Sequence, residues 1–177
     1  DIDVLTTAIV RGAFEFQGQK CSAASRAYIP KSMWSALKDK LVVMVSRIKM
    51  GDPTDPKNLM GAVIDEKSFD NIMKYIEEAK KSSEAEIITG GNGDKSKGYF
   101  IEPTIILCSN PKYATMQEEL FGPVISIYVY EDDKYEETLK LCDETSIYAL
   151  TGSIFSSCRY ATMKAFDALR YSAGNFY

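Results

Sequence analysis

The sequence predicts an α/β fold in which helices flank a mostly parallel sheet. Segments rich in β-branched and aromatic residues alternate along the chain with stretches that repeat apolar residues at helical spacing. The helical stretches are about 12 residues long, which suits βαβ crossovers between parallel strands. The chain has 177 residues and is 45% hydrophobic, so it is long enough to bury a core, and it contains no internal repeat. We therefore expect one α/β domain.

The first half of the chain is expected to begin with a helix over residues 3–16. Leu5, Ile9 and Ala13 recur there at helical spacing, and Gly18 then ends the helix. The next expected elements are a strand over 26–29 that Pro30 stops, a helix that Ser32 caps, a loop over 51–56, a helix over 65–82 and a strand over 86–89.

The second half opens on Gly90-Gly91-Asn92-Gly93, which resembles a hairpin turn. Val124 to Tyr130 is the strongest predicted strand, because it is a dense run of β-branched and aromatic residues. The other expected elements are a strand over 99–107 that Pro103 interrupts, a helix to about 144 that Asp132 or Asp133 caps, a strand over 151–155, a helix over 160–171 with Gly174 as its C′ residue, and a final strand.

The composition excludes several classes of function. The chain contains no histidine, which rules out Ser-His-Asp and Cys-His nucleophile pairs and His-ligated zinc sites within it. A net charge of −4 gives no electrostatic footprint for nucleic acid or an anionic membrane, and no apolar run approaches the roughly 20 residues that span a bilayer. We expect no metal site, no nucleic-acid partner and no membrane partner.

The four cysteines and the two ends of the chain indicate its setting. No two cysteines form a CxxC pair, and reduced thiols of an intracellular protein are expected. The chain begins at Asp1 without methionine and stops at an aromatic, strand-like Asn175-Phe176-Tyr177. We expect a segment of a longer protein.

Cys21 is the first candidate for chemistry. It lies in a turn of small residues between the first helix and the first strand, with Lys20 beside it. Small neighbours admit a substrate to the sulfur, and exposed backbone N–H groups can stabilise an oxyanion. Without histidine, a cation, backbone dipoles or a carboxylate acting through water must favour the thiolate. The alternative is a buried structural cysteine, the expected role of Cys108, Cys142 and Cys158.

Glu118-Glu119-Leu120-Phe121-Gly122-Pro123 is the second candidate, because it leads directly into the strongest strand. Loops at strand ends bind ligands in open α/β sheets. An acid here can accept hydrogen bonds from ribose hydroxyls, and Phe121 can lie against a ring. The alternative is a solvated helix end followed by a turn.

Three motifs together resemble the NAD(P)-dependent aldehyde dehydrogenase superfamily. They are Gly18-Gln19-Lys20-Cys21, Gly98-Tyr99-Phe100-Ile101-Glu102-Pro103-Thr104 and Glu119-Leu120-Phe121-Gly122-Pro123-Val124, in the order in which the family has them. The resemblance runs through nearly all 177 residues and implies the fold of the family's catalytic domain. Further stretches resemble its 1-pyrroline-5-carboxylate dehydrogenase subfamily: 14–23, 51–53, 62–65 and 173–177.

The resemblance implies a role for each matching residue. Cys21 matches the nucleophile, which attacks the aldehyde and forms a thiohemiacetal and then a thioester. Glu119 matches the position that binds the nicotinamide ribose of NAD, and Phe121 one that contacts the nicotinamide region. Ser22 matches a position that helps hold the α-carboxylate of the substrate. Leu150 matches another possible contact, although Ala149 before it departs from the glycine that the family more often has.

The resemblance also implies what lies outside residues 1–177. The general-base glutamate, the oxyanion asparagine and most of the NAD-binding domain are expected before Asp1, and the oligomerisation segment after Tyr177. The chain is thus part of one catalytic domain, inactive alone, from a homo-oligomeric parent. A mitochondrial matrix location is expected in a eukaryote and a cytoplasmic one in a bacterium.

Several alternatives remain open at this point. The parent protein acts on glutamate γ-semialdehyde, on another aldehyde such as succinate semialdehyde, or as a CoA-acylating member of the family. A non-catalytic module with an inert Cys21 is the remaining class.

Overall fold

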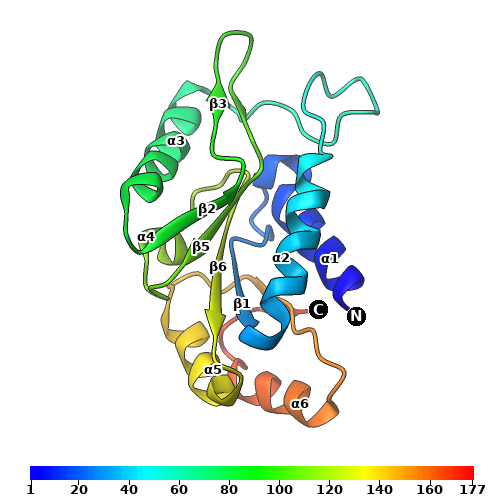
Figure 1. Ribbon diagram of the computed structural model, residues 1–177, viewed down its shortest axis with the longest axis vertical. Helices are drawn as coiled ribbons and strands as arrows, with labels where there is room; N and C mark the ends of the chain where they lie inside the picture. The colour runs from blue at the N-terminus through cyan, green and yellow to red at the C-terminus, as the bar shows by residue number, and fades with distance from the viewer.

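A four-stranded sheet forms the centre of the computed structural model, which describes residues 1–177 (Figure 1). In spatial order its strands are β1 (Arg26–Pro30), β6 (Val124–Tyr130), β5 (Thr104–Cys108) and β2 (Ala85–Thr89). β6 runs parallel to both β1 and β5, and β2 pairs antiparallel with β5. The structure therefore confirms an α/β fold with a mostly parallel sheet.

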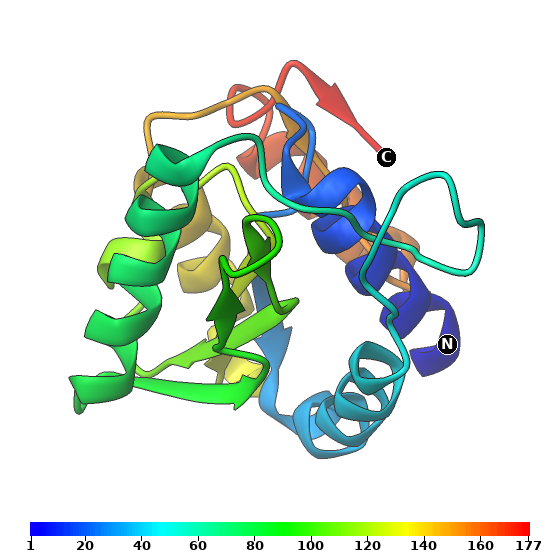
Figure 2. The same cartoon turned by 90° about the horizontal axis from the view of Figure 1, so that it is seen from above.

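Helices cover both faces of this sheet (Figure 2). Successive residues of a strand point to opposite faces, so Ile125 and Ile127 of β6 lie in one core while Val124 lies in the other. The helices are α1 (Ile2–Phe14) and α2 (Lys31–Ser46) on one face, and α3 (Glu66–Lys81) and α4 (Ala114–Gln117) on the other. None of the helices is both long enough and apolar enough to cross a membrane.

Each face of the sheet has its own hydrophobic core. The core under α1 and α2 contains 13 buried residues, among them Phe14, Leu41 and Ile127. The core under α3 and α4 contains 11, among them Ile72 and Ile106. Removing one such side chain from water stabilises the fold by about 1.5–3 kcal/mol, so these two cores fix the sheet and its connections.

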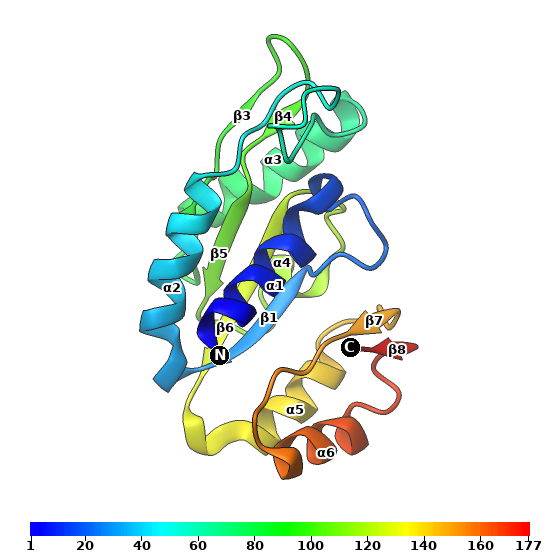
Figure 3. The same ribbon diagram turned by 90° about the vertical axis from the view of Figure 1, so that its right-hand side faces the viewer.

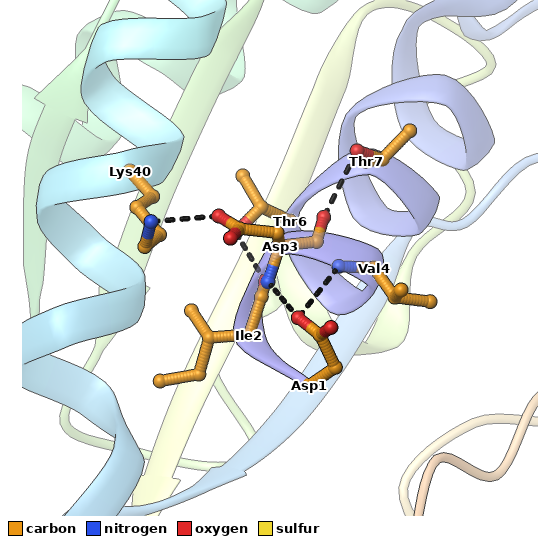
Figure 4. A network of polar contacts seen from close by, with 7 residues as sticks. All are labelled: Asp1, Ile2, Asp3, Val4, Thr6, Thr7 and Lys40. Atoms are coloured by element: carbon orange, nitrogen blue, oxygen red, sulfur yellow. Dashed lines mark hydrogen bonds and ion pairs between the residues drawn. The ribbon is translucent and has the colours of Figure 1, made fainter.

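The amino terminus of α1 is capped and joined to α2 (Figure 4). The Asp1 carboxylate accepts hydrogen bonds from the N–H groups of Asp3 and Val4, at 2.8 and 3.4 Å. The Asp3 carboxylate lies 2.6 Å from Lys40 Nζ of α2. The helix that leads to Cys21 is thus fastened at its start.

Residues 135–177 form a smaller C-terminal lobe beside the larger sheet unit of residues 1–134 (Figure 3). Its elements are α5 (Tyr135–Glu144), α6 (Arg159–Ala168) and a parallel pair of two-residue strands, β7 (Thr151–Gly152) and β8 (Asn175–Phe176). Leu139, Ala165 and Leu169 form its core. The strand expected over 151–155 is therefore shorter and separate from the main sheet.

The segment at Gly90–Gly93 bends a long hairpin and does not close it. β2 pairs with β5, and the chain between them extends as a ribbon of β3 (Gly93–Asp94) and β4 (Phe100–Ile101), seen at the top of Figure 1. Gly90 has φ 76°, and a Cβ there would lie 2.3 Å from the Pro103 carbonyl oxygen. The prediction of a hairpin turn at these residues was wrong. Here glycine lets the backbone bend where it comes very close to the segment at Pro103.

Three further predictions were wrong for reasons of tertiary contact. Ser32 does not cap α2, which begins at Lys31; its N–H and hydroxyl both donate to the Asp132 carboxylate. Asp132 thus completes the start of α2 and does not cap α5, whose N-cap, Lys134, makes no side-chain cap hydrogen bond. Gly174 lies beyond the end of α6 at Ala168, and its N–H donates instead to carbonyls of the 149–150 segment at 3.0 Å.

Candidate active site

The segment before Cys21 has an unusual backbone. α1 ends at Phe14 and passes into the short helical turn η1 (Glu15–Gly18), in which Phe16, Gln17 and Gly18 have φ values of 53°, 59° and 65°. Each non-glycine residue in this left-handed region costs roughly 1–2 kcal/mol. Strain of this kind concentrates at functional sites, where the surrounding structure maintains it.

Cys21 itself lies exposed in the turn that follows, directly before β1. Its backbone N–H and that of Ser22 donate no hydrogen bond within the chain, so both are available to an oxyanion. The Lys20 ammonium is 3.5 Å from a Glu15 carboxylate oxygen and 5.5 Å from the centre of the Phe16 ring. The cation that the sequence places beside Cys21 is therefore already paired with other groups.

The Glu119–Pro123 segment leaves α4 and enters β6. Leu120 and Pro123 are buried, whereas the Glu119 side chain is exposed and forms no ion pair or hydrogen bond. Phe121 has φ 53° and is 40% exposed, which is strained backbone combined with an apolar ring in contact with solvent. The segment thus presents a free carboxylate and an apolar ring to solvent, two positions apart.

The structure brings these two segments together through a pair of glycines. A Cβ on Gly18 would lie 2.2 Å from the Gly122 carbonyl oxygen, so the two backbones are in direct contact. Where the two segments continue into β1 and β6, the Ser126 N–H donates to the Ser25 carbonyl at 3.0 Å, and Arg26 pairs with Ser126 in register. Cys21 and the Glu119–Phe121 stretch thus flank the amino ends of two adjacent parallel strands.

This location differs from the general rule for open α/β sheets, in which ligands lie outside the carboxyl ends of the strands. The carboxyl ends of β1 and β6 are occupied here by the Ser32–Asp132 hydrogen bonds and a Lys31–Glu131 ion pair at 2.7 Å. Sequence reasoning missed the contact between Gly18 and Gly122. Each candidate stretch contains one of these glycines, but only the register of β1 against β6, which the sequence does not show, pairs them.

The other cysteines have different surroundings. Burial raises the pKa of Cys108, which belongs to a core, and likewise raises the pKa of Cys142 in α5. Cys158 is exposed ahead of α6, so its predicted packing role was wrong. No group of three or more metal-ligating side chains is close enough together to hold a metal ion.

Leu150 lies apart from the two segments, in the C-terminal lobe. Its side chain is 53% exposed, and its carbonyl accepts hydrogen bonds from the N–H groups of Gly174 and Asn175. The lobe reaches the site through Ser146, whose hydroxyl donates to the Gln117 carbonyl at 3.1 Å, two residues before Glu119. The structure therefore joins Ser146, and not Leu150 itself, to the segment that leads to Glu119.

Two curated proteins with similar sequences carry the same enzyme name. The mitochondrial Δ1-pyrroline-5-carboxylate dehydrogenase of Dictyostelium discoideum is 60% identical over 177 residues, which is 100% of this chain and 32% of that protein. The human mitochondrial enzyme of the same name is 48% identical over 178 residues, again 100% of this chain and 32% of that protein. The chain thus spans about a third of the length of the curated relatives it matches.

Solved structures agree with the sequence comparison. A crystal structure of the Δ1-pyrroline-5-carboxylate dehydrogenase of Mycobacterium tuberculosis superposes with a TM-score of 0.92 at 44% identity, over 100% of this chain and 32% of that one, and the same enzyme has been solved with NAD. Lactaldehyde dehydrogenase of Escherichia coli gives a TM-score of 0.91 at 26% identity, over 100% of this chain and 36% of that one. The aldehyde dehydrogenase family model matches residues 1–177, and the chain belongs to the aldehyde dehydrogenase family.

Proposed function

We propose that this segment supplies the nucleophile of an NAD-dependent dehydrogenase that oxidises L-glutamate γ-semialdehyde to L-glutamate. The semialdehyde forms from Δ1-pyrroline-5-carboxylate, so the reaction completes the catabolism of proline. The observation that carries the proposal is the contact between Gly18 and Gly122, which joins the Cys21 turn to the Glu119–Phe121 stretch. The names of the relatives at 60% and 48% identity support the choice of substrate.

Cys21 performs the covalent step in this proposal. Its thiolate attacks the aldehyde carbon, a C–S bond forms, and the carbonyl oxygen becomes the alkoxide of a thiohemiacetal. The Cys21 backbone N–H, which makes no other hydrogen bond, donates to that oxygen. After oxidation the product is a thioester, and water that a glutamate outside this segment activates releases the acid and the thiolate.

The remaining residues bind and orient. Glu119 accepts hydrogen bonds from the ribose hydroxyls of the cofactor, and the Phe121 ring lies beside its nicotinamide end. NAD, when bound, supplies the acceptor for the hydride that leaves the thiohemiacetal carbon. The exposed Ser22 hydroxyl donates to the α-carboxylate of the substrate and so sets which aldehyde reaches Cys21.

The proposal extends to groups outside residues 1–177. The general-base glutamate, the oxyanion asparagine, the NAD-binding domain and the oligomerisation segment belong to the rest of a homo-oligomeric parent. This segment is accordingly part of the catalytic domain and does not turn over substrate alone. The mitochondrial location in the names of eukaryotic relatives supports the same location for a eukaryotic parent.

A comparison of the full-length protein with the 177-residue chain tests the proposal. We expect NAD-dependent oxidation of glutamate semialdehyde by the former and none by the latter. A higher kcat/KM for succinate semialdehyde or short aliphatic aldehydes would refute the substrate, and a requirement for CoA during turnover would identify an acyl-transferring member. A rate in the isolated chain near that of the full-length protein would refute its incompleteness.

A further inference from the structure

The left-handed turn before Cys21 is held by two glutamine side chains. Gln17 Oε1 accepts a hydrogen bond from the Gly61 N–H at 2.9 Å, and its Nε2 donates to the Ala62 carbonyl at 3.4 Å. Gln19 Oε1 accepts from the Ile64 N–H at 2.9 Å. The carboxamides thus pair with backbone groups of Met60–Ile64, which we name the strap, much as a neighbouring strand would.

The strap is a rigid partner because both cores anchor it. Met60 is 1% exposed in the core under α1 and α2, and Val63 is 3% exposed in the core under α3 and α4. The Val63 N–H also donates to the Tyr99 carbonyl at 2.9 Å. Gln17 and Gln19 therefore attach the nucleophile segment to a point that neither core allows to move.

The attachment closes a ring of contacts around the site. The strap leads through Asp65, which caps α3 by accepting from the Ser68 N–H at 2.7 Å. Ile72 of α3 packs so closely on Gly122 that a Cβ there would lie 2.3 Å from the Ile72 Cδ1. Gly122 in turn contacts Gly18, so the turn, the strap, α3 and the Glu119–Pro123 segment hold one another.

We infer that Gln17 and Gln19 are positioning residues, whose grip on the strap fixes where the Cys21 sulfur lies relative to Glu119 and Phe121. The inference rests on the proposed function, since it assigns a task to the reaction of Cys21. Neither glutamine touches substrate in this role. Each acts by maintaining the left-handed backbone of Phe16 and Gln17, which non-glycine residues disfavour.

The test uses Gln17→Leu, Gln19→Leu and Gln17→Glu in the full-length protein. Leucine fills similar space without a hydrogen bond, whereas glutamate keeps the oxygen that accepts from Gly61. Asn58→Ala is the matched control, because the Asn58 carboxamide also bonds a backbone carbonyl, that of Asp52 at 3.0 Å, in the neighbouring loop. We measure kcat, both KM values, the iodoacetamide rate at Cys21 relative to the exposed Cys158, and amide exchange at Gly61 and Ile64.

We expect each leucine variant to lower kcat and the Cys21 alkylation ratio about 10- to 100-fold, as small misplacements of a reacting group do, with KM for NAD within about twofold. Exchange should rise at Gly61 for Gln17→Leu and at Ile64 for Gln19→Leu, and Gln17→Glu should recover most of the rate. Faster amide exchange with an unchanged kcat and an unchanged alkylation ratio at Cys21 would overturn the positioning role. An Asn58→Ala variant that loses as much kcat as the leucine variants would overturn it too. If Cys21 reacts no faster than Cys158 in the unsubstituted protein, the nucleophile assignment is refuted instead. Amide exchange at Gly61 would still show whether Gln17 holds the strap. If a leucine variant does not fold, Gln17→Glu and the exchange rates decide the question.

Discussion

The sheet unit and the C-terminal lobe differ in how completely they bury their apolar side chains. The sheet unit contains cores of 13 and 11 buried residues, whereas the lobe has a core of three. The lobe also exposes large apolar side chains, with Ile147, Tyr160 and Tyr171 at 91%, 86% and 87% exposure. It is joined to the sheet unit by few polar contacts, among them Arg26 Nη2 to the Cys142 carbonyl at 3.2 Å.

This difference shows which part of the molecule can hold reacting groups in place. Cys21, Ser22, Glu119 and Phe121 all belong to the sheet unit, and Leu120, between Glu119 and Phe121, lies in one of its cores. Local opening is easiest where few apolar contacts are buried, so in the 177-residue chain the lobe should open before the site does. Three paired substitutions, with one member in each region, test this division, and a fourth pair tests a link within the sheet unit.

The largest expected effect separates the two exposed cysteines. We expect Cys21→Ser in the full-length protein to lower kcat about 10⁴-fold or more, because the covalent step loses its nucleophile. Cys158→Ser in the lobe should leave kcat within about twofold. Steady-state rates with glutamate semialdehyde and NAD measure both. Equal losses in the two variants would place Cys158 in the reaction and contradict the division.

The next pair compares two glycines by unfolding of the chain in urea. Gly18→Ala should lower the free energy of unfolding by about 3 kcal/mol or more, since a Cβ there meets the Gly122 carbonyl oxygen at 2.2 Å on a backbone with φ 65°. Gly174→Ala should cost less than about 1 kcal/mol, because its nearest contact would be the Leu150 carbonyl oxygen at 3.4 Å. Similar losses at both positions would show that the lobe is as tightly packed as the site.

Local patterns in the sequence predicted most of the sheet unit. β6 was located at its observed bounds, because a dense β-branched and aromatic run has few alternatives to a buried strand. α3 was also found, with Asp65 before it and an apolar stripe along it. What failed depended on distant residues: Ser32 and Asp132 lie far apart in the chain, and no local rule relates a cap to a helix elsewhere.

The candidate site divides in the same way. Cys21 and the Glu119–Phe121 stretch stood out through neighbours in sequence, small residues for one and a Gly-Pro turn before a strand for the other. Their contact through Gly18 and Gly122 was not predictable, because it depends on the register of β1 against β6. The final strand was found, but the strand expected over 151–155 was predicted too long, because pairing, and not residue preference, decides two-residue strands.

The third pair removes one leucine from a core in each region. Leu41→Ala should cost about 3–4 kcal/mol, since Leu41 is fully buried and its surroundings are too constrained to collapse. Leu139→Ala should cost about 2 kcal/mol, because Leu139 is 8% exposed in a small core that can relax. Urea midpoints measure the cost, and amide exchange should speed up only in the lobe for Leu139→Ala. Faster exchange throughout the sheet unit in that variant would mean that the two regions unfold together.

The smallest expected effect lies within the sheet unit, at the start of α2, and depends on pH. The Ser32 hydroxyl, and then its N–H, hold the pKa of the Asp132 carboxyl below its ordinary value of about 3.9. A depressed folded-state pKa stabilises the protein above that ordinary value, and the stabilisation is lost as pH falls through the lower folded value. We expect Asp132→Asn, which keeps one acceptor but not the charge, to have a lower urea midpoint than the unsubstituted chain at pH 6, with the gap closing towards pH 3. Asp133→Asn beside it is the control, since Asp133 accepts no bond from Ser32. Because this link ties β6 to α2 within the sheet unit, amide exchange in α6 should not change. A difference in urea midpoint that does not depend on pH would mean that the charge of Asp132 does not stabilise the start of α2.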